Sequence, residues 1–273
     1  MESSPKAAGS AEPAIKRAFT ELDRLLRGEV TQTASLQRGA IDVDPGRLSL
    51  VAIVLSMVYG ACMGTFALFS TRSASAMQVL ASMIKVPALF FLTLLVTLPS
   101  LYVFNALVGS RLTVGAVVRL LVATLGVIVA VLASLGPIVA FFSVSTTSYP
   151  FILLFNVVSF GVSGTLGMLF LLQTLHRLTL ARPLSTPDLA APSPAEPMSE
   201  PAGPLDRLDD RLLSRHVRTI FRIWMIVFAL VGAQMGWVLR PFVGNPNLPF
   251  TWFRGRESNF FQAVFHTISS LFS

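Results

Sequence analysis

Long apolar runs separated by short polar connections dominate the chain. Five of these runs, at residues 48–69, 86–104, 117–142, 151–172 and 220–239, have the length of a membrane-spanning helix, which needs about 20 apolar residues. In lipid, backbone polar groups find partners only within the protein, so such a run crosses a bilayer as a helix. The pattern therefore predicts an all-α, polytopic transmembrane helix bundle with five spans.

Two shorter amphipathic segments flank these runs. Residues 1–47 form a polar tail, in which apolar residues at helical spacing predict a helix at 13–27. Three interpretations of this helix stay open: docking on the protein's own cytoplasmic side, lying on an anionic leaflet, or binding a partner. In the last segment, 240–273, an apolar stripe predicts a helix at 260–272 that is too short to span. We expect this second helix to lie in the interface or to fold back on the bundle.

A polar loop separates the fourth run from the fifth. Spans one to four occupy residues 48–182, and the loop follows at 183–219. Its first part is rich in proline, which predicts an extended chain. Residues 205–219 resume a helix with Asp near its start and Arg near its end, an order that suits the helix dipole. This loop is the candidate contact for a protein partner.

Small residues within the runs predict close contacts between helices, because a missing side chain lets two backbones approach. The residues concerned are Gly60, Gly64, Gly161, Gly164 and Gly167. Proline interrupts two runs: Pro99 is expected to kink or end the second span, and Gly136-Pro137 to kink the third after about Ser134. The Gly136-Pro137 break is either a tolerated kink or a broken helix lining a cavity, as in transporters.

Charge is scarce, and its placement indicates an orientation. Only 13% of the 273 residues are charged, 53% are hydrophobic, and no Asp or Glu occurs between Pro45 and Pro187. The formal net charge is +7, but the basic residues flank the apolar runs instead of forming one face, which disfavours a nucleic-acid partner. Their excess on the side of the N-terminus predicts a cytoplasmic N-terminus and an external C-terminus. Since 18 of the 21 basic residues are Arg, we expect a high-GC bacterial genome and the cell inner membrane.

The scarcity of charged residues also argues against several kinds of functional site. Lys85 is expected at the boundary before the second span, so that no span holds a central charge. A carboxylate relay or a carboxylate-lined sodium site therefore does not fit inside the membrane. The three histidines are too scattered to share a metal ion, and Cys62 is the single cysteine. We expect no enzymatic activity, no metal and no cofactor.

The order of a polar cytoplasmic N-terminus, five closely spaced spans and a short external C-terminus resembles the Yip family of membrane-trafficking proteins and its bacterial relatives. The resemblance covers residues 48–239 and includes Val58-Tyr59-Gly60 and Gly136-Pro137. The family's acidic Asp-Leu-Tyr-Gly-Pro signature is not matched, since Met57-Val58 precedes Tyr59-Gly60 and Ala61 replaces the proline. The resemblance implies that this chain is a five-span membrane protein of a family whose members interact with small GTPases.

Two functions fit these features. The first is a non-enzymatic scaffold or accessory subunit, with the bilayer and a protein at residues 183–219 as partners, alone or in a homo- or hetero-oligomer. The alternative is a permease-like subunit for a neutral or anionic solute, which would use the Gly136-Pro137 break with Asn156, Gln234 and Arg240. The remaining candidate interaction residues follow the fifth span: Trp252, Arg254 and Arg256.

Overall fold

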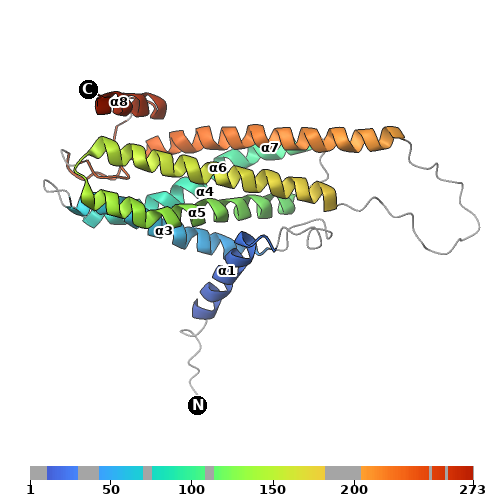
Figure 1. The fold of residues 1–273 in the computed structure, drawn as a ribbon, viewed down its shortest axis with the longest axis horizontal. Coiled ribbons are helices and arrows are strands. Elements are labelled where there is room, and N and C mark those ends of the chain that lie inside the picture. Colours follow the sequence, from blue (N-terminus) through green and yellow to red (C-terminus); the bar gives the residue numbers. More distant parts are fainter. Residues whose placement is uncertain are drawn as a thin grey trace, which may run out of the picture.

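The chain is helical throughout most of the part that the computed structural model describes. The described residues are 11–29, 43–69, 76–107, 114–181, 204–245, 248–255 and 258–272. Within these ranges the chain forms seven α-helices and no strand, which confirms the predicted all-α class (Figure 1). The proline-rich part of the loop before the fifth span, at 183–203, and Arg256 lie outside the described residues.

Five of the helices are long and apolar enough to cross a membrane, as predicted. They are α3 (Pro45–Phe69), α4 (Ala76–Leu107), α5 (Val114–Ser145), α6 (Tyr149–Ala181) and α7 (Pro204–Leu239). Their length and apolar composition make the chain a multi-pass membrane protein. Each helix is longer than the apolar run that predicted it, because the helix continues into the polar residues beside that run.

Two helix boundaries differ from the prediction. Lys85 was expected outside the second span, but α4 already begins at Ala76, so a charged residue lies within this span. The charged stretch at 205–219 and the fifth span at 220–239 form the single helix α7. α4 continues through Pro87, and no proline or glycine separates the helix predicted at 205–219 from the fifth span.

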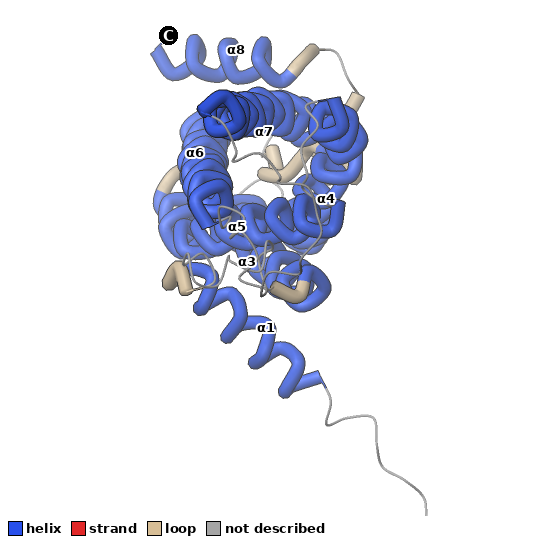
Figure 2. The backbone as a smooth tube through the Cα atoms, turned by 90° about the vertical axis from the view of Figure 1, so that its right-hand side faces the viewer, coloured by secondary structure: helices blue, strands red, loops and turns tan. Residues whose placement is uncertain are grey.

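The five spans form a ring. α3 contacts α4 and α5, α5 contacts α6, α4 contacts α7, and α6 meets α7 to close the ring. Figure 2 looks along this bundle and shows the loop that follows α7 inside the ring. Burial differs greatly among the helices: 67% of the α5 span is buried inside the chain, but only 17% of the α7 span. One side of α7 is therefore left to lipid or to another protein.

Two glycines set the distance between α3 and α4. A β-carbon at Gly60 would lie 2.5 Å from the Ser82 carbonyl oxygen, and a β-carbon at Gly64 would lie 2.7 Å from the Cα atom of Val79. Both neighbours are backbone atoms of α4, which side-chain rotation cannot move away. The two helices thus approach each other at a small-xxx-small pair.

The three glycines of α6 differ from one another. A β-carbon at Gly167 would lie 2.3 Å from Cγ1 of Ile128, so this glycine lies at the contact between α6 and α5. At Gly161 and Gly164 no described atom lies within 4 Å of the β-carbon position. The packing expected of Gly161 and Gly164 is therefore absent within the described part of the chain, since helical spacing alone does not tell which face turns inward.

Pro99 and Pro137 lie inside continuous helices. α4 continues past Pro99 to Leu107, and α5 continues past Pro137 to Ser145. A membrane helix tolerates proline where neighbouring groups compensate for the lost hydrogen bond. A β-carbon at Gly136 would lie 3.2 Å from the Cys62 sulfur on α3. The Gly136-Pro137 pair thus lies at a helix contact, and the third span is not a broken helix.

The helix α1 (Ala11–Leu26) docks against the bundle with one face. Ala18, Leu22 and Leu25 are buried in a cluster with residues of α3 and α5. Gly28, with a φ of 75°, ends the helix, and its N–H donates to the Leu25 carbonyl oxygen at 3.0 Å. One face of α1 therefore docks on the protein itself, which was one of the three interpretations of this segment.

The helix α8 (Phe260–Phe272) lies on the outside of the bundle. Asn259 caps it, because its side-chain oxygen accepts a hydrogen bond from the Gln262 N–H at 2.8 Å. α8 contacts α6 and α7, and the two views together show it running across these helices instead of along them (Figures 1 and 2). These contacts show that α8 folds back on the bundle, which was one of its two expected placements.

Candidate functional site

Three polar residues share one face of α4 near its N-terminal end. Gln78, Ser82 and Lys85 are spaced by four and three residues, so their side chains lie on the same side of the helix. All three are buried, with exposed fractions of 2%, 0% and 3%. Buried polar side chains need hydrogen-bond partners. Here the partners are main-chain carbonyl oxygens of the segment that follows α7.

This segment, residues 240–259, is named the cap segment; its residues 246–247 and 256–257 are not described. The described part has no helix or strand before α8 and enters the ring of spans (Figure 2). Val243 is buried, and Phe242 packs against the same apolar cluster. A β-carbon at Gly244 would lie 2.7 Å from Cβ of Ala67 on α3, so the backbone of the cap segment closely approaches that helix.

The polar face of α4 binds the backbone of the cap segment. Gln78 Nε2 donates to the carbonyl oxygens of Pro241 at 3.1 Å and Phe242 at 2.9 Å. The Ser82 hydroxyl lies 2.5 Å from the same Phe242 oxygen. Lys85 Nζ donates to the Pro241 oxygen at 3.0 Å and to that of Trp252 at 2.5 Å. These bonds satisfy carbonyl groups that irregular backbone would otherwise bury unpaired.

The Lys85 ammonium group is surrounded by oxygen atoms and an aromatic ring. In addition to its two carbonyl partners, Nζ lies 5.2 Å from the centroid of the Phe253 ring, within the range of a cation–π contact. Arg254 is near enough for its like charge to repel that of Lys85. A charge in apolar surroundings is costly unless polar groups replace its water, and here backbone carbonyls do so. Lys85 therefore fastens the cap segment to α4.

The cap segment is also fastened to the end of α7. The guanidinium carbon of Arg240 lies 3.6 Å from the centroid of the Trp237 ring, and its Nη2 donates to the Gly255 carbonyl oxygen. The Trp237 Nε1–H donates to the Ser258 carbonyl oxygen. The Arg240–Pro241 peptide bond is cis. Contacts from both α4 and α7 thus hold the cap segment in place and close this end of the ring.

Deeper in the bundle, the candidate residue Asn156 joins two helices. The Tyr59 hydroxyl on α3 donates to Asn156 Oδ1 on α6 at 2.9 Å, and Asn156 Nδ2 donates to the Ile152 carbonyl oxygen at 2.8 Å. The Tyr59 ring meets Phe160 edge-on, with 5.6 Å between ring centroids. Both side chains are buried and hydrogen-bonded. This pair ties α3 to α6, and the Asn156 amide oxygen accepts a hydrogen bond from within the protein.

A small apolar cavity lies between α4, α5 and α7. Its volume of about 10 Å³ corresponds to the space for a single water molecule. Trp224 lies beside it and donates its Nε1–H to the Thr97 carbonyl oxygen at 3.0 Å. The lining residues are Leu94, Leu121, Thr124, Leu125, Ile128, Trp224, Met225 and Phe228.

The structure places the candidates from the sequence in two groups. Arg240, Trp252 and Arg254 belong to the cap segment. Trp252 and Arg254 lie next to Lys85, and Arg240 contacts Trp237 and the Gly255 carbonyl oxygen. Trp252 contributes its carbonyl oxygen, while its side chain is 41% exposed. Asn156 and Gln234 lie instead within the helices α6 and α7.

The polar face of α4 was not among the candidates. A signal for it exists in the sequence, because the polar residues between 76 and 85 recur at helical spacing among apolar ones. That spacing indicates a helix with a polar stripe on its inner face. The carbonyl oxygens that accept these hydrogen bonds have no comparable signal in the sequence. Every residue has a carbonyl oxygen, and the sequence does not show which carbonyl groups need a side-chain donor.

The contacts of Gln78, Ser82 and Lys85 hold the backbone of the cap segment in place. The described residues include no group of three or more His, Cys, Asp or Glu that could hold a metal ion. Comparisons of the chain with family models, curated proteins and solved structures found no match.

Proposed function

We propose that this protein is a non-enzymatic scaffold or accessory subunit that engages a protein partner through the cytoplasmic part of α7. The observation that carries the proposal is that α7 is one continuous helix from Pro204 to Leu239. Its 36 residues extend over about 54 Å, whereas the hydrocarbon core of a bilayer is about 30 Å thick. About 20 Å of helix therefore projects from the membrane and moves together with the span.

The projecting part of α7 has the composition of a contact surface in water. Its charged residues follow one another closely, with the acidic ones mostly ahead of the basic ones: Asp206, Arg207, Asp209, Asp210, Arg211, Arg215 and Arg218. Leucines recur among them at helical spacing. Inside the membrane the same helix is the least buried of the five spans. One partner would thus be able to contact α7 both in water and in lipid.

The proposal includes an orientation in the cell inner membrane, with a cytoplasmic N-terminus and an external C-terminus. The distribution of Arg around the spans supports it. Single cysteines at Ser148 and Ser258, tested with a membrane-impermeant maleimide on intact cells, should both be labelled from outside. Labelling of either position only after the inner face is exposed would contradict this orientation.

Photo-crosslinking in cells tests the partner. A photoreactive amino acid at Leu212, in the projecting part, should give one discrete protein adduct, and the same probe at Leu50 on α3, which is 41% exposed, serves as the control. Reversal of charge at Arg211 and Arg215 should weaken the Leu212 adduct. Adducts with lipid alone at Leu212 would refute the scaffold function.

The cap segment supports a second candidate function, a permease-like subunit for an anionic solute. Lys85 and Arg254 place two cationic groups near one another, and Arg240 binds the backbone of the same cap segment at Gly255. A panel of neutral and anionic solutes, scored by the thermal stability of the purified protein, tests this function. Stabilisation by one anion that Lys85→Met abolishes, with an unchanged crosslinking pattern at Leu212, would favour transport over the scaffold.

The relationship to Yip proteins also stays a prediction. Two residues that carry the resemblance have roles in packing, since Tyr59 binds Asn156 and Gly60 contacts α4. If the relationship holds, the partner captured at Leu212 should be a small GTPase. Binding of purified bacterial GTPases to the full-length protein in detergent, in their GDP and GTP forms, would test this identity.

A further inference from the structure

The helix α1 has three distinct edges. On a helical projection, the buried residues Ala18, Leu22 and Leu25 fall within about 60° of one another and form the edge that docks on the bundle. A second set of apolar residues is directly adjacent and is exposed: Ile15 at 42%, Phe19 at 39% and Leu26 at 52%. These three fall within about 40° of one another. The bundle thus covers only part of the apolar surface of α1.

The edge opposite the exposed apolar residues is polar. Arg17 and Arg24 lie about 160–180° away from the centre of the Ile15, Phe19 and Leu26 edge. Docking by a third, lateral edge therefore leaves α1 with one apolar side and one polar side. A helix at a membrane surface has this arrangement, with lipid on one side and water on the other.

The position of α1 on the bundle matches a membrane interface. Leu22 lies near Leu48 and Gly126, since a β-carbon at Gly126 would be 3.4 Å from Leu48 and 3.5 Å from Leu22. Leu48 belongs to the first turn of α3, where the chain enters the first span. α1 extends away from the side of the bundle, at a steep angle to the spans (Figures 1 and 2). A helix that crosses the spans at this point lies in the leaflet surface around them.

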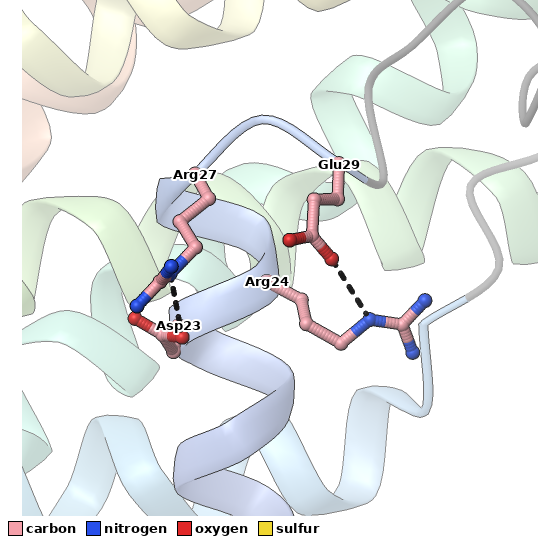
Figure 3. A network of polar contacts seen from close by, with 4 residues as sticks. All are labelled: Asp23, Arg24, Arg27 and Glu29. Carbon is pink, nitrogen blue, oxygen red and sulfur yellow. Dashed lines mark hydrogen bonds and ion pairs between the residues drawn. The ribbon is translucent and has the colours of Figure 1, made fainter.

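The polar part of α1 has little net charge. Residues 11–29 contain four basic and four acidic side chains, so their formal charges cancel. Arg27 Nε pairs with Asp23 at 2.8 Å and Arg24 Nε pairs with Glu29 at 3.3 Å (Figure 3). The hydrogen bond from Arg27 to Asp23, and next the charge of Asp23, raises the pKa of Arg27. Attraction to anionic headgroups is therefore not the main force on this helix.

We propose that α1 is embedded in the leaflet beside the bundle, with Ile15, Phe19 and Leu26 among the acyl chains. The occupant of the exposed apolar edge is lipid of the same bilayer that the spans cross, because the neighbouring outer face of α3 is also exposed and apolar at Leu50 and Ile53. The contact depends on apolar burial and requires no anionic lipid. This inference is independent of any partner of α7, since it needs only the bilayer.

Lipid-depth quenching on the full-length protein tests the proposal. An environment-sensitive fluorescent amino acid is introduced by codon suppression at Phe19 in one variant and at Arg17 in its matched control, and both are reconstituted in phosphatidylcholine vesicles. Quenchers attached near the top of the acyl chains should reduce the emission at Phe19 at least threefold more than that at Arg17. Addition of 30% phosphatidylglycerol should change neither value.

A second pair, Leu26 and Arg24, repeats the comparison about two helical turns away, so that local misfolding at one site does not decide the result. Equal quenching at both members of each pair, or no quenching at Phe19 and Leu26, would overturn the proposal. Quenching that appears only with phosphatidylglycerol would also overturn it, because it would show electrostatic adsorption. Elution of each variant at the wild-type volume confirms that the bundle is intact.

Discussion

Replacement of Gly60 by alanine tests the contact between α3 and α4 most directly. The new β-carbon would lie 2.5 Å from the Ser82 carbonyl oxygen and 2.9 Å from the Cα atom of Met83. Carbon and oxygen atoms in ordinary contact are at least about 3.3 Å apart, so the two helices would have to separate by nearly 1 Å. Both obstructing atoms belong to the backbone, so no change of rotamer relieves the clash.

The net effect is a loss of stability. Overpacking of this kind costs about 1–3 kcal/mol. Alanine is a better helix former than glycine by up to about 1 kcal/mol, which offsets part of this cost. We therefore expect Gly60→Ala to lower the free energy of unfolding by about 1–2 kcal/mol. Separation of the helices would also draw Ser82 away from the Phe242 carbonyl oxygen, which adds to the loss.

Gly164→Ala is the matched control, because no described atom lies within 4 Å of its β-carbon position. Unfolding by sodium dodecyl sulfate in mixed micelles, followed by circular dichroism, would compare both variants with the wild type. Gly164→Ala should leave the midpoint unchanged or raise it slightly. If Gly60→Ala proves as stable as Gly164→Ala, the close approach of α3 and α4 is wrong.

Three further substitutions test contacts of the site. Lys85→Met removes two hydrogen bonds from a charged donor, so hydrogen exchange of the amides at 248–255 should accelerate at least about tenfold, and unchanged exchange would contradict the fastening of the cap segment. Tyr59→Phe leaves Asn156 Oδ1 without its partner and should lower the free energy of unfolding by about 1–2 kcal/mol in the detergent titration. Trp224→Phe keeps an aromatic ring but loses one hydrogen bond, and its midpoint should fall by the equivalent of about 1 kcal/mol; an equal midpoint would mean that this bond contributes nothing.

The number of spans could be predicted from the sequence, but the residues at which the second and fifth spans begin could not. Hydropathy specifies which segments enter lipid, because an unpaired backbone group there is costly. It does not specify where a helix stops in water, where both helix and loop satisfy the backbone. Residues 76–85 continue the second span as helix for this reason, and the helix predicted at 205–219 joins the fifth span without a break.

The cap segment could not have been predicted as a contact from residue types alone. Three of its residues, Arg240, Trp252 and Arg254, were candidates for interaction on the basis of the sequence. The contacts that hold it to α4 join residues more than 150 positions apart, such as Lys85 and Pro241. They involve backbone carbonyl oxygens, which carry no signature in the sequence.

Lys85 is buried in a stretch, residues 45–187, that contains no acidic residue. A cation within a span must have oxygen atoms around it, and no carboxylate exists in that stretch to supply them. Carbonyl oxygens in the middle of a helix already accept hydrogen bonds from their own helix. The free oxygens must then come from irregular backbone, which is tolerated at membrane depth only inside the protein. A lysine within an acid-free span therefore predicts a non-helical segment folded into the bundle, and the cap segment with its prolines is that segment here.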